Sequence, residues 1–315
     1  MTSPVDFLPT DQTLCYGPDG RVIPCANAGQ DASFKNNAPL PTSQRFHPQG
    51  QIVRDTLTGA VWSRNANLPE FPLTWNEAQT FVENMRARHV YGRDDWQLPS
   101  RGLLFSLISH QEINPTLAEG HPFQNVFSGY YWTADTCHRL PNQAWYVHLG
   151  GGRVHRGMKH GSYMVWPVSV HDIGTAVDTI TGTDRFNIDG LCVHDPVTGL
   201  TWSRNADTAD GPLDWQQAID MVAQMNTNLM NGHSDWRLPT IRELERLVSL
   251  DAHSPALPSG HPFVNVRDAY WSSTTSVYEP RYAWTVYMED GIIGVGFKPI
   301  ADFYLWPVRG RIPGP

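Results

Sequence analysis

The stretch that decides the fold, Asp95-Trp96-Gln97-Leu98-Pro99-Ser100-Arg101, returns later as Asp235-Trp236-Arg237-Leu238-Pro239-Thr240-Ile241-Arg242-Glu243. In each copy a Trp and a Leu lead into a Pro, and a Ser or Thr follows where a helix N-cap belongs. Glu243 stands three residues after Thr240, which is the offset of a capping box. Apolar residues continue at helical spacing, namely Leu103, Leu104, Leu107 and Ile108, then Leu244, Leu247 and Val248. Each copy therefore predicts a turn that leads into an amphipathic helix packed on the core.

The rest of the chain repeats in step with this stretch. Trp62, Trp96 and Trp166 each recur 140 positions later, as Trp202, Trp236 and Trp306. Each copy opens with two short strand patterns around a Gly-containing turn, continues with a helix that Thr74 or Asp214 would cap, and closes with short aromatic strands. This order predicts a tandem duplication of one α+β domain with twisted antiparallel strands. A solenoid has much shorter periods.

The duplication sets the expected boundaries along the chain. Residues 1–45 are rich in Pro, Asn, Gln, Asp and Thr, and we expect an extended arm that lies on a domain surface. The first domain is expected over 46–170, a linker over 171–185, and the second domain over 186–311.

Composition narrows the class of protein. The 315 residues suffice for two domains, and only 17% are charged, whereas Gly (26), Pro (25) and Trp (12) are abundant. This mixture is typical of a loop-rich fold held by aromatic side chains, and it argues against disorder or a helical bundle. No apolar run approaches the roughly 20 residues of a membrane span. The first residues lack the basic region and apolar core of a signal peptide, so we expect either that a signal has been removed or that the protein is not exported by that route.

Charge is distributed unevenly between the copies. Residues 46–170 hold 10 Lys/Arg and 9 Asp/Glu, whereas residues 186–310 hold 8 Lys/Arg and 15 Asp/Glu. The two copies should therefore present different electrostatic surfaces, through drift of solvated positions or through specialisation for different partners. The net charge of −8 and the lack of a long basic surface argue against nucleic acid as a partner.

Four cysteines bear on compartment and metal binding. Cys15 and Cys25 flank a turn-rich loop, which predicts a local disulfide and favours an oxidising compartment: secreted, cell-surface or periplasmic. Cys137 and Cys192 stand at non-equivalent positions, and Cys192 fits a small core residue in an apolar strand. No Cys/His set has zinc spacing, so we expect no structural metal.

Several motifs in fixed order point to one family. They are Thr-Gly-x-x-Trp, Asp-Trp-Arg-Leu-Pro-Thr-x-x-Glu-Leu, Tyr-Trp-Ser-Ser-Thr, Ala-Trp and Trp-Pro-Val-Arg-Gly. This set resembles the Lcl C-terminal domain family, which is named for a bacterial collagen-like adhesin. The resemblance covers Gly190 to Gly310, and Gly50 to Val168 with Gln97 in place of the usual Arg. It implies a C-type-lectin-like fold with two helices in each domain, and a bacterial, exported setting. The named adhesin binds sulfated glycosaminoglycans, so the resemblance also implies a binding or adhesion role.

The copies differ most between the Ala-Trp strand and the Trp-Pro strand. The first copy is basic there, and we expect Arg153, Arg156 and Lys159 to contact an anionic glycan, assisted by His138, His155 and His160. The plainer interpretation is a solvated basic hairpin. The second copy is apolar there, at Ile292-Ile293 and Val295 to Phe297, which favours core strands over a contact surface.

Other candidate residues are better explained as scaffold. Residues kept in both copies, while surface charge diverged, are expected to hold loops in place; they are Arg64-Asn65, Arg204-Asn205, Asp95, Asp235, His121 and His261. A calcium-dependent sugar site is not expected, because Arg281 follows Glu279-Pro280 and no Trp-Asn-Asp occurs.

No catalytic residues and no cofactor are expected, because the chain lacks nucleophile-elbow and phosphate-loop motifs. The sequence thus favours an exported, non-enzymatic binding or adhesion module. The alternative is a structural subunit of an extracellular assembly, with protein contacts or self-assembly, and an enzyme on a lectin-like scaffold comes third.

Overall fold

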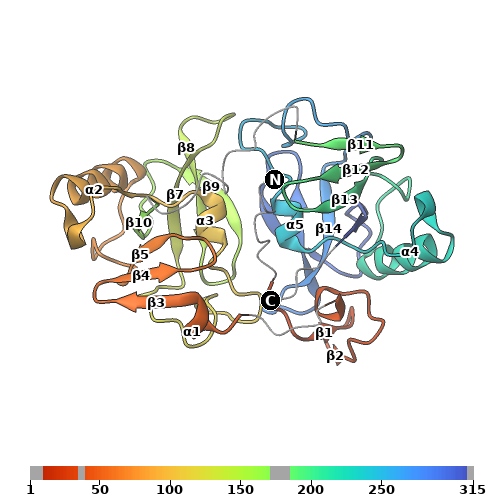
Figure 1. Cartoon of the computed structure of the whole chain (residues 1–315), viewed down its shortest axis with the longest axis horizontal. Coiled ribbons are helices and arrows are strands. Elements are labelled where there is room, and N and C mark those ends of the chain that lie inside the picture. The colour runs from red at the N-terminus through yellow and green to blue at the C-terminus, as the bar shows by residue number, and fades with distance from the viewer. Residues whose placement is uncertain (1–9, 35–39, 171–184, 311–315) are drawn as a thin grey trace. The chain divides into compact units, whose positions relative to one another are not determined.

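The computed structural model describes residues 10–34, 40–170 and 185–310. These residues form two compact units. One unit contains residues 40–170, called repeat 1 below. The other contains residues 185–310, called repeat 2, together with residues 10–34, called the arm. Each repeat is α+β, with one main helix and antiparallel sheets (Figure 1). The expected linker lies outside the described residues except for Arg185, which is buried and pairs with Asp195 at 2.6 Å.

Repeat 1 contains two antiparallel sheets. The first has the strand order β3-β4-β5-β10-β6, and in the second β8 pairs with both β7 and β9. The elements are α1 (Thr42–Arg45), β3 (Phe46–Gln49), β4 (Ile52–Asp55), β5 (Val61–Ser63), α2 (Trp75–Ala87), the 3-10 helix η2 (Val90–Gly92), β6 (Trp96–Gln97), α3 (Arg101–Phe105), β7 (Tyr130–Thr136), β8 (Gln143–His148), β9 (Val154–Met158) and β10 (Val168–Ser169).

Repeat 2 has the same plan, with a sheet in the order β11-β12-β13-β17 and a meander in which β15 pairs with β14 and β16. The elements are β11 (Asn187–Asp189), β12 (Cys192–Asp195), β13 (Leu200–Ser203), α4 (Trp215–Thr227), the 3-10 helix η3 (Met230–Gly232), α5 (Ile241–Glu245), β14 (Ala269–Thr275), β15 (Tyr282–Tyr287), β16 (Ile293–Phe297) and β17 (Val308–Arg309). No helix in the described part of the chain has the length and apolar character that crossing a membrane requires.

The main helices begin where the capping signals place them. Thr74 caps α2 and Asp214 caps α4, each in a capping box with the residue three positions on. The second helix of each repeat has only five residues, although the apolar spacing suggests more. Its end has a local cause, because Leu107 and Leu247 bond the carbonyl three residues back, which tightens the chain into a 3-10-type turn. Leu107 and Leu247 are nevertheless buried.

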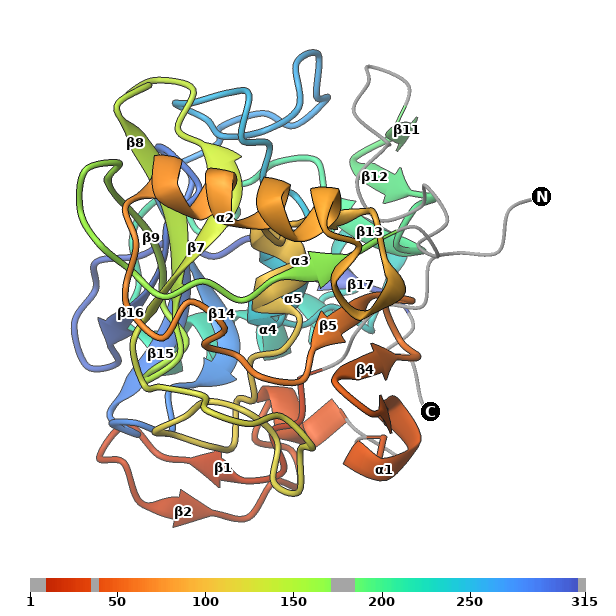
Figure 2. The same ribbon diagram turned by 90° about the vertical axis from the view of Figure 1, so that its left-hand side faces the viewer.

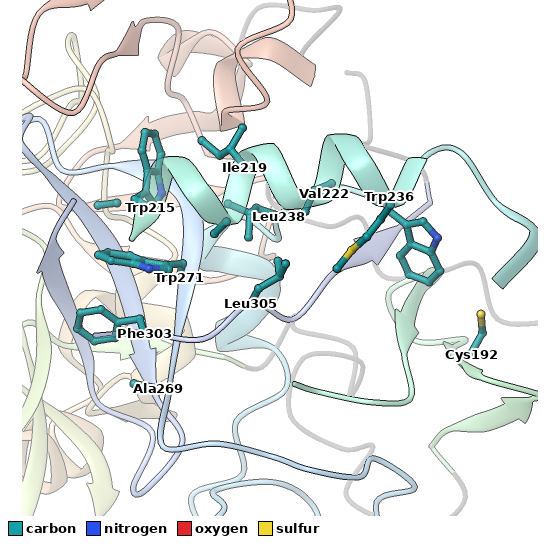
Figure 3. Close-up of a cluster of buried hydrophobic side chains, with 13 residues drawn as sticks. Cys192, Trp215, Ile219, Val222, Trp236, Leu238, Ala269, Trp271, Phe303 and Leu305 are labelled. Atoms are coloured by element: carbon teal, nitrogen blue, oxygen red, sulfur yellow. The ribbon is translucent and has the colours of Figure 1, made fainter. Parts of the chain in front are cut away.

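Tryptophan builds the interior of both repeats. Trp62 packs on Trp166, and Trp202 on Trp306, with ring centroids 5.3 and 5.4 Å apart. In repeat 2 the side chains of α4 meet those of the β14–β15 meander, where Trp215, Trp271 and Phe303 lie together (Figure 3). Ten of the tryptophans are almost fully buried, which explains why so many occur in a chain with few charges.

The arm is a small structure of its own that packs on repeat 2. It contains the hairpin of β1 (Cys15–Tyr16) and β2 (Val22–Ile23), closed by the predicted Cys15–Cys25 disulfide, and then the 3-10 helix η1 (Asp31–Phe34) (Figure 2). The side chain of Gln30 accepts from the backbone N–H of Tyr16 and donates to its carbonyl, both at 2.9 Å. The arm precedes repeat 1 in the sequence, but it belongs to the same compact unit as repeat 2.

Candidate functional site

The basic hairpin of repeat 1 exists, but its cations do not share one surface. Arg153 lies exposed just before β9, and His155 and Arg156 are neighbours within that strand. Successive side chains of a strand point to opposite faces. Accordingly His155 pairs with Tyr146 and Arg156 with Trp145 in the register of β8 and β9.

The remaining predicted residues lie at the ends of the strands. Lys159 follows β9, and its Nζ lies 4.4 Å from the ring centroid of Trp75. His160 is exposed in the turn beyond it, and His138 is exposed in the loop between β7 and β8. Arg156 lies 6.0 Å from the ring of Trp145. The structure therefore groups Arg153 with His155 and places Arg156 on the other face of the sheet.

Arg153 borders a cluster of exposed and half-buried aromatic rings, which we call the tyrosine platform. Its members are Tyr130, Tyr146, His148, His155 and Tyr163. Tyr130 is 44% exposed and stacks on His148, with centroids 4.6 Å apart. The centroid of Tyr146 lies 4.9 Å from that of Tyr130 and 5.1 Å from that of Tyr163, and the Tyr146 ring stacks on His155 at 6.1 Å. Neighbouring strands β7 and β8 hold these rings in register.

Burial favours the neutral form of Tyr146 and His148 within the platform. Burial, followed by Tyr163 and Tyr130, raises the pKa of Tyr146 to about 12, so its phenol keeps its proton and can donate a hydrogen bond. Burial lowers the pKa of His148, and Arg153 lowers it further, which favours a neutral imidazole. Arg153 thus supplies a permanent positive charge beside uncharged aromatic faces. This combination suits a ligand that has both an anionic group and a flat apolar surface.

Repeat 2 keeps an aromatic ring at only two of the equivalent positions, where Tyr287 and Phe303 replace His148 and Tyr163. Strand register places Ala269 where repeat 1 has Tyr130, Thr285 where it has Tyr146, and Gly294 where it has His155. Ile292 replaces Arg153, since each residue bonds through its carbonyl to the end of the preceding strand. The platform therefore belongs to repeat 1 alone among the two copies.

The residues kept in both copies make contacts inside the fold. Arg64 and Arg204 donate through Nε to the carbonyls of Pro122 and Pro262, at 3.2 and 3.3 Å, rather than to an Asp. The side-chain Oδ1 atoms of Asn65 and Asn205 each accept a hydrogen bond from the backbone N–H two residues on. These contacts are what the scaffold interpretation requires.

The two remaining Asp residues of this set pair near the ends of the sheets. Asp235 accepts from Arg309 Nε at 2.7 Å, and Asp95 accepts from the hydroxyl of Ser169 at 2.6 Å. Burial lowers the pKa of both His121 and His261, each of which packs against a Phe two residues on.

Metal-ligating side chains do not gather in the part of the chain that the structure describes. No group of three His, Cys, Asp or Glu residues there is arranged to hold an ion. Glu279 forms an ion pair with Arg281 at 3.0 Å. Arg281 stands where a calcium-binding lectin motif would have a third residue with a side-chain oxygen. Cys137 and Cys192 are buried and are not joined by a disulfide.

Arg153 and His155 could be identified from the sequence, but the other members of the platform could not. Tyr130, Tyr146, His148 and Tyr163 come from three separate segments, which only the folded sheet brings together. A comparison of the two copies could have indicated these residues. Tyr130 aligns with Ala269, and Tyr146 aligns with Thr285, so repeat 1 has an aromatic residue where repeat 2 has a small one.

The sequence of the chain was compared with those of known proteins and protein families. No curated protein matches the chain. The sequence profile of the Lcl C-terminal domain matches twice, over residues 51–169 and again over residues 191–309. The two matches cover most of the chain and coincide with the two structural repeats. The chain therefore belongs to the Lcl C-terminal domain family and carries two tandem copies of that domain.

Proposed function

We propose that this protein is an exported binding module, and that the tyrosine platform of repeat 1 binds an acidic polysaccharide. The observation that carries the proposal is the cluster of Tyr130, Tyr146, His148, His155 and Tyr163, partly open to solvent, beside the exposed Arg153. The sugar rings would lie on the aromatic faces, and a sulfate or carboxylate would pair with Arg153. The role needs no catalytic group.

Two further features support this function. The Cys15–Cys25 disulfide is consistent with an extracellular protein. Each repeat has two helices and many strands, which fits a C-type-lectin-like domain, a scaffold suited to presenting a binding surface. Residues 46–170 carry a net charge of +1, so repeat 1 is better suited than repeat 2 to bind an anion.

The test is retention of the intact protein on immobilised heparin at low and at physiological salt. We expect retention that weakens as salt rises, since the contact includes a charge pair. Arg153→Ala and Tyr130→Ala should each weaken binding, by roughly tenfold for the charge-assisted contact of Arg153. N-desulfated heparin should bind less well than heparin.

The matched control is Arg86→Ala, which removes one exposed Arg from α2 of the same repeat and leaves the platform intact. It should elute with the wild type. Equal shifts for the two Arg variants would mean that only net charge matters, and no retention of the wild type at physiological salt would refute the proposal.

A further inference from the structure

The arm occupies a surface of repeat 2 through a small set of specific contacts. The amide of Gln12 binds both backbone groups of Thr275, donating to the carbonyl at 2.8 Å and accepting from the N–H at 2.9 Å. Asp31 accepts a hydrogen bond of 2.6 Å from the hydroxyl of Thr274. Lys298 donates from Nζ to the carbonyl of Tyr16 at 3.2 Å. We call this surface, made by Trp215, Ile219, Thr274, Thr275, Arg281 and Lys298, the arm-binding face.

Contact between the arm and this face is close. Two glycines of the arm with positive φ lie directly against it: a Cβ on Gly29 would come within 2.7 Å of Ile219, and one on Gly20 within 3.0 Å of Arg281. In Figure 3 Ile219 stands on α4 near the ribbon of the arm. Thr274, Thr275 and Lys298 are completely buried. The arm therefore covers polar groups that a folded repeat would otherwise present to solvent.

Repeat 1 shows that the fold does not need this cover. Its strand β7 pairs with β8 in the same register as β14 with β15, so Thr136 is equivalent to Thr275. Lys159 is equivalent to Lys298, because Trp75 and Trp215 bond their respective Lys carbonyls at 3.0 Å. Yet Ala134 and Thr136 are exposed in repeat 1, whereas Ser273 and Thr275 are completely buried in repeat 2. The arm-binding face is thus a surface of a complete domain rather than part of its core.

The arm holds its own shape by internal bonds. The Cys15–Cys25 disulfide closes its hairpin, Gln30 binds the backbone of Tyr16 on both sides, and Thr10 donates to Asp31 at 2.6 Å. A ligand already held in its bound conformation loses less conformational entropy on binding. The arm is therefore organised as a peptide ligand.

We propose that the arm is a separable ligand of repeat 2 and that the arm-binding face can take the arm of a second copy of this chain. In sequence, all of repeat 1 separates the arm from the face that it binds. Such a contact can form within one chain or between two, according to concentration and effective concentration. Between chains it is a head-to-tail contact, which leaves one arm and one face open for further copies.

The differences between the repeats direct the arm to repeat 2. Asp135 occupies the position of Thr274 and would bring a carboxylate toward Asp31. Gln79 replaces the apolar Ile219 on which Gly29 packs. Asp135 also shows that a carboxylate is compatible with the fold there: its Oδ2 accepts from the N–H of Arg101 at 2.5 Å, as the hydroxyl of Thr274 accepts from Ile241 at 3.1 Å.

The experiment uses two full-length variants that complement each other. The donor carries Thr274→Asp, which keeps its arm but gives its own face the residue of repeat 1. The acceptor carries Gln12→Ala and Asp31→Ala, which keeps the face but disables the arm. Hydrogen exchange of the Thr275 amide, which donates to Gln12, reports whether the arm has been released in each variant.

We expect each variant alone to sediment as a monomer and the equimolar mixture to form a heterodimer of twice the 35.4 kDa chain mass. In the mixture the Thr275 amide of the acceptor should regain protection. A second donor carries Lys298→Met, which removes the amine that binds the arm. It should release its own arm and form a heterodimer with the acceptor, as the Thr274→Asp donor does. The proposal is overturned if the arm stays bound in both donors, or if the released arm forms no heterodimer with the acceptor. Neither result depends on polysaccharide binding.

Discussion

At the scale of single residues, the two copies differ in the side chains that fill one equivalent buried site. In repeat 2 the buried Arg237 forms a two-pronged ion pair with Glu243, both contacts at 2.6 Å. Repeat 1 has Gln97 and Leu103 at the equivalent positions, 140 residues earlier. A buried ion pair is weak evidence for stability, but removing one partner leaves an uncompensated charge. The natural pair in repeat 1 therefore indicates which double substitution repeat 2 should tolerate.

Glu243→Ala should lower the free energy of unfolding of the unit containing repeat 2 by about 3–5 kcal/mol, because Arg237 remains buried without its partner. The variant also loses the contact of Glu243 with the Thr240 N–H at 2.7 Å. The double variant Arg237→Gln/Glu243→Leu should cost markedly less. Urea denaturation of the full chain, followed by tryptophan fluorescence, measures both. Equal losses in the two variants would show that the unpaired charge is not the cause.

At the scale of elements, what could be predicted from the sequence was local. The starts of α2 and α4 follow from Thr74 and Asp214 because a capping box involves residues three positions apart. The length of α3 could not be read from apolar spacing, since Leu107 stays buried in a 3-10-type turn. The contact between the arm and repeat 2 could not be predicted from the sequence either, because Gln12 and Thr275 are 263 positions apart.

The arm also changes the chemistry of the element that it covers. Burial lowers the pKa of Lys298 from 10.5 to about 7, and only Asp19 of the arm raises it. The other groups around this amine are uncharged or already paired: Tyr16, Thr275 and Trp215 contact it, and Arg281 nearby pairs with Glu279. Lys159, its half-buried equivalent in repeat 1, has no arm above it.

Docking of the arm should therefore strengthen as pH rises between about 7 and about 10.5. The docked state has the lower pKa, so docking releases a proton in this window, and affinity rises by at most about tenfold per pH unit. Below pH 7 the amine is protonated in both states and this dependence ends. Sedimentation of the donor and acceptor mixture at pH 6, 7.5 and 9 measures it. Heterodimer affinity that stays constant between pH 7.5 and pH 9 would contradict a role for the Lys298 amine in this dependence.

At the scale of the whole molecule, duplication has produced two domains with one fold and different surfaces. Repeat 1 has the tyrosine platform and exposed residues on β7, whereas repeat 2 has Ala269, Thr285 and Gly294 at three of the platform positions and a fully buried β14. The net charges of +1 and −7 in residues 46–170 and 186–310 follow the same division. The two contacts that we propose therefore fall on different domains: an acidic polysaccharide on repeat 1 and the arm of a second copy on repeat 2.

Redox state should control the second of these contacts and leave the domains folded. The Cys15–Cys25 bond closes a loop of sequence separation 10 within the arm and lies outside both repeats. Reduction frees the hairpin, so ordering the arm on repeat 2 becomes more costly, by about 2 kcal/mol or roughly thirtyfold in affinity. Heterodimer formation, measured by sedimentation, should fall accordingly. Near-ultraviolet circular dichroism should barely change, because the packed tryptophans of both repeats do not depend on the bond. Cys15→Ser/Cys25→Ser is the matched variant, and it should behave like the reduced protein under oxidising conditions. Undiminished heterodimer formation after reduction would show that the disulfide does not preorganise the arm.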